Sequence, residues 1–149
     1  MKIVLLSVAV ITSVFAAVAP PAHAQAAWPV VYRETAVNVA LDTAGAIRNR
    51  DGSYVTRTRW DYARAHLLES KKPYTQMTEV ALLKCTPVRI KRLTESFYGE
   101  GGAAVKEGTM PDPAEVQYMT WDRLPVRSEG SRAFSNICSI LTKRNKAKR

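Results

Sequence analysis

The side chains that could perform catalysis are few. His66 is the single histidine beyond the N-terminal segment, so a histidine metal site or a Ser-His-Asp triad lacks residues that it needs. Serine-hydrolase and zinc-protease motifs are absent, and the glycine-rich run 99–102 lacks the lysine of a phosphate-binding loop and predicts a hairpin turn. Asp61, Glu79 and Glu95 could form the acid–base pair of a small hydrolase if the fold brought two of them together. The sequence therefore favours a protein that is not an enzyme and uses no cofactor or metal.

Cys85 and Cys138 could carry redox chemistry or form a structural bridge. They lie far apart in the chain rather than in the Cys-x-x-Cys spacing of a redox pair, which favours a structural disulfide. Closing a loop of this length should stabilise the fold by about 4 kcal/mol in the chain-entropy model. A redox pair and two buried free thiols are the alternatives.

The basic residues form the third group with possible chemistry. The chain carries 22 Lys and Arg against 13 Asp and Glu, a net charge of +9, which attracts polyanions without selecting one. The last residues, 143–149, predict either a solvated, disordered tail or a contact with an anionic surface. No aromatic residue is interleaved with this tail, which argues against dedicated nucleic-acid binding. The candidate contact residues are Arg89, Lys91, Arg92, Lys143, Arg144, Lys146, Lys148 and Arg149.

The N-terminal segment predicts export. Lys2 is followed by an apolar stretch over 3–19, two prolines, and Ala22-His23-Ala24, the three-part pattern of a signal peptide spanning residues 1–24. An uncleaved membrane anchor is the alternative, although the stretch is short for a bilayer. No cysteine follows for lipid attachment, and no later segment is apolar enough to span a membrane. We expect a periplasmic or secreted protein in an oxidising compartment, where a disulfide persists.

Most of the remaining chain predicts strands. The residues of 54–62 alternate, with Tyr54, Thr56, Thr58, Trp60 and Tyr62 expected on the inward face. Asp51-Gly52 predicts a tight hairpin turn before this strand. Segments 63–73 and 110–118 are expected to be loops, the first because Pro73 ends any helical turn. The other expected strands are 37–41, 47–50, 77–85, 88–98 and 103–106.

The end of the chain predicts a helix. Ser128 is a good N-cap, and the apolar residues Ala133, Phe134, Ile137, Cys138 and Leu141 recur at helical spacing. Because Cys138 belongs to this stripe, a bridge to Cys85 would hold the helix against the sheet. The expected fold is α+β, an antiparallel sheet of about six strands with one disulfide-tethered C-terminal helix, in a single domain over 25–142. Trp28, Trp60 and Trp121 are predicted to pack in the core rather than to form an exposed binding platform.

The order of these features resembles the surface-adhesin protein E-like family of Gram-negative bacteria. The matching features are Trp28, the segments 41–47 and 52–62, Cys85 with Arg89 and Lys91, and Trp121, Pro125, Ser128 and Cys138. The resemblance implies a roughly six-stranded antiparallel sheet and a disulfide-tethered C-terminal helix. It also implies an adhesin role, since the best-known member binds host extracellular proteins such as laminin and vitronectin. This chain lacks the lipid-attachment cysteine of that member.

These observations lead to three ranked hypotheses. The first is a non-enzymatic, exported, adhesin-like module that contacts a host extracellular-matrix protein or an anionic envelope or polysaccharide surface. The second is a periplasmic accessory protein with a structural or assembly role at the envelope. The third is a small hydrolase with a carboxylate site.

Overall fold

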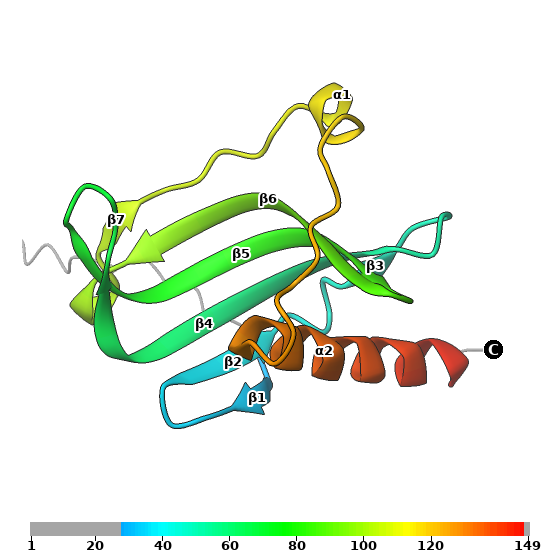
Figure 1. Ribbon diagram of the computed structural model, residues 1–149, viewed down its shortest axis with the longest axis horizontal. Coiled ribbons are helices and arrows are strands. Elements are labelled where there is room, and N and C mark those ends of the chain that lie inside the picture. Colours follow the sequence, from blue (N-terminus) through cyan, green and yellow to red (C-terminus); the bar gives the residue numbers. More distant parts are fainter. Residues whose placement is uncertain (1–27, 148–149) are drawn as a thin grey trace, which may run out of the picture.

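The computed structural model describes residues 28–147, which fold into one antiparallel sheet, two α-helices and one turn of 3₁₀-helix (Figure 1). The predicted signal peptide, 1–24, lies outside these residues, as do Lys148 and Arg149. The strands are β1 (Val30–Arg33), β2 (Val37–Leu41), β3 (Ile47–Arg48), β4 (Tyr54–Leu67), β5 (Pro73–Cys85), β6 (Val88–Tyr98) and β7 (Ala104–Lys106); the helices are η1 (Glu100–Gly102), α1 (Pro113–Val116) and α2 (Glu129–Lys146). Within the described part of the chain, neither α-helix has the length and apolar composition needed to span a bilayer.

The sheet has seven strands in the order β1-β2-β4-β5-β6-β7, with β3 also paired to β4. The prediction of an α+β fold with a C-terminal helix and a tethering disulfide is confirmed, with one strand more than expected. Side chains of β4 alternate as predicted: Thr56, Thr58 and Trp60 are buried, while Arg57 and Arg59 face the other way. We call the face of Trp60 the inner face of the sheet and the face of Arg57 the outer face.

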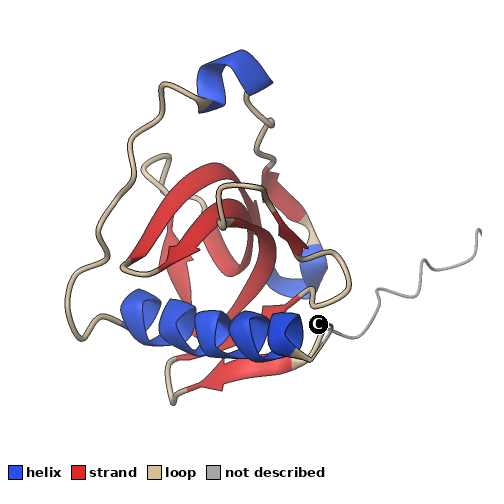
Figure 2. Ribbon diagram, turned by 90° about the vertical axis from the view of Figure 1, so that its right-hand side faces the viewer, coloured by secondary structure: helices blue, strands red, loops and turns tan. Residues whose placement is uncertain are grey.

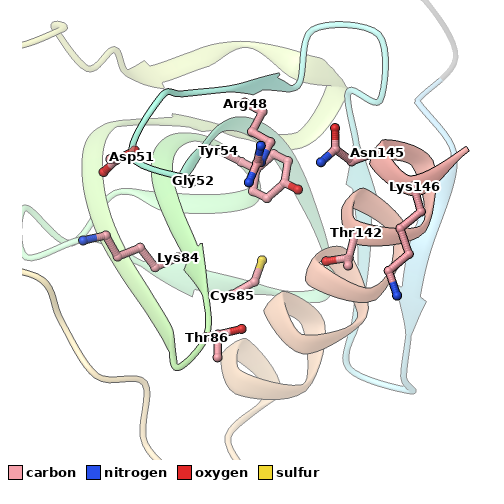
Figure 3. Close-up of a pocket in the computed structure, with 10 residues that line it drawn as sticks. All are labelled: Arg48, Asp51, Gly52, Tyr54, Lys84, Cys85, Thr86, Thr142, Asn145 and Lys146. Carbon is pink, nitrogen blue, oxygen red and sulfur yellow. The ribbon is translucent and has the colours of Figure 1, made fainter. Parts of the chain in front are cut away.

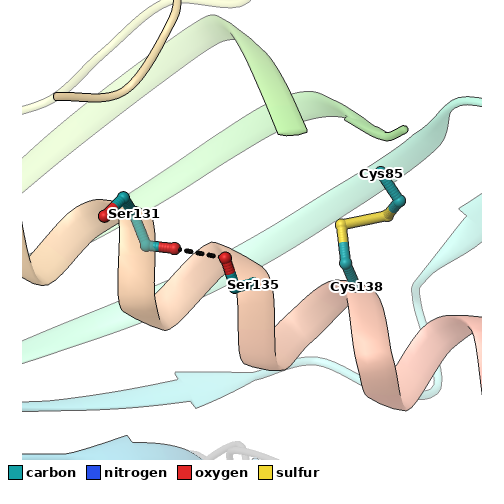
Figure 4. The surroundings of a disulfide bond; sticks show 4 residues. All are labelled: Cys85, Ser131, Ser135 and Cys138. Atoms are coloured by element: carbon teal, nitrogen blue, oxygen red, sulfur yellow. Dashed lines mark hydrogen bonds between the residues drawn. A yellow bond between two sulfur atoms is a disulfide. The ribbon is translucent and has the colours of Figure 1, made fainter. Parts of the chain in front are cut away.

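Helix α2 covers the inner face of the sheet (Figure 2). Ser128 caps it by accepting a hydrogen bond from the N–H of Ser131 at 3.1 Å, and the five predicted stripe residues are all buried. Phe134 packs on Trp60 with ring centroids 5.9 Å apart. The disulfide between Cys85 and Cys138 joins the end of β5 to the middle of the helix (Figure 4).

Helix α2 continues further than the sequence indicates. Residues 143–146, expected in a disordered tail, form its last turn. Cations are favourable there because the free carbonyls of a helix C-terminus carry partial negative charge. Arg144 also donates to the carbonyl of Thr43, which attaches this turn to the loop after β2.

The prediction of a loop over 63–73 is wrong at both ends, because β4 continues to Leu67 and β5 begins at Pro73. His66 pairs with Tyr74 across the two strands after a local irregularity. The ring of His66 lies 4.4 Å from Tyr62 and 5.7 Å from Tyr74, so aromatic contacts hold this part of the hairpin together. His66 itself is exposed, as predicted.

The segment between β7 and α2 crosses the outer edge of β6. It contains α1, a single helical turn where a loop was expected, closed by the capping box of Asp112 and Glu115. Asp122 pairs through its backbone with Ile90 on β6. Trp121, next to it, is half-buried beneath two ammonium groups, with Lys84 at 4.5 Å and Lys91 at 5.2 Å from its ring. Of the three tryptophans predicted in the core, only Trp60 is there.

Candidate functional site

A basic cavity lies between the last turns of α2 and the β3–β4 hairpin (Figure 3). Its volume is about 470 Å³. It is lined by Arg48, Asp51, Gly52, Tyr54, Lys84, Cys85, Thr86, Thr142, Asn145 and Lys146. A second cavity of about 430 Å³ shares Cys85, Thr86, Thr142 and Lys146 with the first and adds Lys143. We call the two together the basic groove; Arg144 lines a smaller cavity of about 110 Å³ that shares Arg48, Tyr54 and Asn145 with the first.

One wall of the basic groove is the hairpin turn after β3. Asp51 accepts hydrogen bonds from the N–H of Ser53 at 3.0 Å and from its hydroxyl at 2.6 Å. These bonds lower the pKa of the Asp51 carboxyl, so it is charged at neutral pH. Gly52 supplies the positive φ of 83° that the turn requires. The turn therefore fixes the backbone next to Arg48, and its own carboxylate is occupied by Ser53.

The opposite wall is held by the disulfide. Cys85 and Cys138, whose Cα atoms are 5.4 Å apart, both line the second cavity. The bridge brings the β5–β6 turn next to the helix face that carries Thr142 and Lys146. On the exposed side of α2 nearby, the hydroxyl of Ser135 donates to the carbonyl of Ser131 at 2.7 Å (Figure 4).

The cations in and beside the basic groove differ in whether another group of the protein contacts them. Lys84 lines the first cavity, but its ammonium lies over the ring of Trp121. Arg144, in the adjoining cavity, donates to the carbonyl of Thr43. Arg48, Lys143 and Lys146 have no carboxylate within 4.0 Å among residues 28–147. Three cations without ion-pair partners in this part of the chain, placed on two adjoining cavities, make a positive potential that favours an anionic partner.

The structure separates the predicted basic residues into two groups. Lys143 and Lys146 lie in the basic groove, whereas Arg89, Lys91 and Arg92 lie on β6. Lys91 is only 7 % exposed and donates to the carbonyl of Val116 at 3.0 Å. Arg89 is half-buried. Lys91 is therefore engaged within the fold, whereas Arg92 is exposed.

Arg92 lies among carboxylates on the inner face. Its Nε is 3.1 Å from Oε1 of Glu79 and 3.6 Å from Oε1 of Glu95, and its Nη1 is 3.7 Å from Oδ2 of Asp122. We call these four residues the carboxylate cluster. Burial raises the pKa of Glu79 to about 7, against the opposing effect of Arg92 and with a further contribution from Glu95.

Two of the carboxylates considered for acid–base catalysis therefore do meet. Glu79 and Glu95 face each other across β5 and β6, whereas Asp61 lies on the outer face, paired with Arg59. A hydrolase would need substrate to reach both groups. Glu79 is only 2 % exposed and does not line the neighbouring cavity, which Arg92 and Glu95 do line. This geometry suits a structural ion cluster in which Glu79 is buried and its partners reach the surface.

Arg48 is the residue that the sequence analysis missed. It stands just before the Asp-Gly turn in a two-residue strand, and its type and position resemble those of many surface arginines. Only the tertiary contact between the hairpin and the end of α2 places it beside Lys146.

No three His, Cys, Asp or Glu side chains converge on a possible metal position within residues 28–147. No protein family model, no curated protein and no solved structure matches this chain.

Proposed function

We propose that this protein is a non-enzymatic, exported module that binds a phosphate- or sulfate-bearing polysaccharide surface through the basic groove. The observation that carries the proposal is the convergence of Arg48, Lys143 and Lys146 on adjoining cavities, none of them within 4.0 Å of a carboxylate among the described residues. Guanidinium and ammonium groups are the usual partners of phosphate and sulfate oxygens.

The form of the groove also supports a surface contact. The backbone of its walls is fixed by the disulfide and by the hydrogen-bonded turn at Asp51, so the groove does not have to form when a ligand binds. Each lysine or arginine near an anionic surface contributes about 1 kcal/mol. Three such residues can give reversible attachment that depends on ionic strength.

Export to the periplasm or beyond is part of the proposal. The disulfide between Cys85 and Cys138 is compatible with an oxidising compartment, and the sequence pattern of residues 1–24 predicts the signal that would lead there. The resemblance to the surface-adhesin protein E-like family supports a contact role in the same direction.

Retention on immobilised heparin, a sulfated polysaccharide, tests the proposal. The variant Arg48→Gln/Lys143→Gln/Lys146→Gln should elute at a much lower salt concentration than the parent protein. These side chains are at the surface and make no ion pair in the described structure, so the variant should fold normally, which circular dichroism would check.

A matched control separates the site from total charge. Arg33, Arg64 and Lys72 are exposed and do not line the basic groove, so replacing all three by Gln removes the same charge. We expect this control to elute close to the parent. Equal losses in both triple variants would show that heparin responds only to net charge, and the proposed site would be wrong.

A further inference from the structure

A separate cavity lies on the outer face of the sheet, opposite to α2, and shares no lining residue with the basic groove. Its volume is about 530 Å³, within the range of about 300–1,000 Å³ that is usual for small-molecule sites. It is lined by Trp28, Asp42, Arg57, Arg59, Gln76, Thr78, Tyr98 and Gly102. Neither its position nor its residues follow from the proposed function.

The pairing of β4, β5 and β6 brings the polar side chains of this cavity onto one face of the sheet. Arg59 lies opposite Thr78, and Gln76 lies opposite both Asp61 and Tyr98, so three adjacent strands present side chains to the same face. The Nε of Arg59 donates to Asp61 at 3.0 Å, and the amide of Gln76 donates to the same carboxylate at 2.7 Å. This arrangement neutralises Arg59 and fixes its orientation.

Arg57 is different. It stands two residues earlier on the same face, is exposed, and has no carboxylate within 4.0 Å among residues 28–147. A guanidinium without a protein partner at the wall of a cavity is suited to bidentate binding of a ligand carboxylate. The matched Arg59 beside it cannot take this role without losing Asp61.

The rest of the cavity favours a ring with hydroxyl groups. Trp28 and Tyr98 contribute aromatic side chains, against which the apolar C–H face of a sugar can pack. The N–H of Leu41 donates to the carbonyl of Pro29 at 3.1 Å, which ties the backbone next to Trp28 to β2. Asp42, held by the N–H of Gly45 at 2.8 Å, supplies carboxylate oxygens that accept hydrogen bonds from hydroxyls.

We propose that the outer-face cavity binds a carboxylate-bearing sugar of about one ring, with Arg57 on its carboxylate, Asp42 on its hydroxyls and the two aromatic side chains against its C–H face. An anionic ligand without hydroxyls would repel Asp42, and a neutral sugar would leave Arg57 unpaired. The combination of an unmatched arginine, a carboxylate and aromatic rings selects a ligand that carries both groups.

Titration of the ¹⁵N-labelled protein with D-glucuronate tests this proposal, with D-glucose and acetate as separate probes. The chain has three tryptophans, so the indole N–H signal of Trp28 reports on the cavity while those of Trp60 and Trp121 serve as internal controls. We expect a saturable shift of the Trp28 signal with glucuronate and a much weaker response to glucose and to acetate.

The variant Arg57→Gln should weaken glucuronate binding by about tenfold or more, because it removes a charge-assisted hydrogen-bonding partner. Arg64→Gln, on the same strand but outside the cavity, is the matched control and should leave binding unchanged. The proposal is wrong if glucuronate gives no saturable Trp28 shift, if glucose binds equally well, or if both variants lose affinity to the same extent.

Discussion

The basic groove and the carboxylate cluster are two places where charged side chains lie close together, and they differ in whether the cations have carboxylate partners. In the cluster, one cation, Arg92, lies within 4.0 Å of three carboxylates. In the groove, Arg48, Lys143 and Lys146 have no such counter-charge among the described residues. Both regions contribute basic residues to the net charge of the protein. Of the two, only the basic groove has cations that are free, within the described residues, to pair with a ligand.

Solvent exposure sharpens this difference. Glu79 is 2 % exposed, so its interaction with Arg92 is screened little by salt. The groove cations lie at the surface, where salt weakens their attraction for a ligand. Charge in the cluster should therefore affect folding and its pH dependence, whereas charge in the groove should affect binding and its salt dependence.

Removal of the disulfide should have the largest effect. The bridge closes a loop with a sequence separation of 53, and the variant Cys85→Ala/Cys138→Ala should lose about 4 kcal/mol of unfolding free energy. Urea denaturation measures this loss. Because the bridge holds one wall of the basic groove, heparin retention should also fall.

The same variant tests whether the carboxylate cluster is independent of the disulfide. Glu79 and Arg92 are adjacent through the sheet itself, so the raised pKa of Glu79 should survive without the bridge, as measured by NMR. A return of that pKa to its ordinary value would show that the cluster depends on the disulfide as much as the groove does.

The pH dependence of stability should show the next largest effect. The pKa of Glu79 rises from 4.5 to about 7 on folding, mainly through burial. The folded protein therefore binds more protons than the unfolded chain between these values, and the free energy of unfolding should fall as the pH rises through this window. The shift corresponds to a loss on the order of 3 kcal/mol, complete above pH 7.

Glu79→Gln is the test of this assignment. The variant cannot ionise, so its unfolding free energy should change much less between pH 5 and pH 8 than that of the parent in parallel urea titrations. Glu69→Gln, at an exposed position in the turn between β4 and β5 and outside the carboxylate cluster, is the control and should keep the slope. Identical slopes in all three proteins would assign the pH dependence to other groups.

The sequence predicts the local parts of this architecture well. The cap at Ser128, the apolar stripe of α2 and the Asp-Gly turn each depend on residues close in the chain, and all three are confirmed. The disulfide follows because Cys138 belongs to the stripe that must face the sheet. The extension of β4 to Leu67 depends instead on Tyr62 and His66 meeting Tyr74, which local pattern does not show.

The orientation of Arg92 depends on a further long-range feature. Ile90 and Phe97 are both buried, yet strict alternation along β6 would put residues seven apart on opposite faces. The register shift between β5 and β6 at Val80/Ala81 resolves this conflict, and it turns Arg92 inward with Ile90 while Lys91 faces outward. The sequence alone does not show that Arg92 lies on the inner face and Lys91 on the outer face.

Arg92→Gln should have a smaller effect on stability than the changes above. Removing the cation leaves Glu79 buried beside Glu95, but Glu79 can take up a proton, which limits the loss to about 2 kcal/mol at pH 8. Urea denaturation at pH 8 and at pH 5 measures it, and the loss should be smaller at pH 5. Heparin retention should stay the same; a drop as large as that of a groove variant would return Arg92 to the contact surface that the sequence predicts.

Lys146→Gln should have the smallest effect on folding and a clear one on binding. Lys146 is exposed in the last turn of α2, so its loss should change the unfolding free energy by no more than about 0.5 kcal/mol. Because it lines both cavities of the basic groove, heparin affinity should fall by about fivefold at low ionic strength, the equivalent of about 1 kcal/mol. Affinity measured at low and at high salt distinguishes an effect of the lysine charge from a packing defect. If the charge acts, the difference in affinity between parent and variant should shrink as salt screens the lysine. A difference that persists unchanged at high salt would mean that Lys146 acts through the shape of the groove, and the contrast with the carboxylate cluster would then concern geometry rather than unmatched charge.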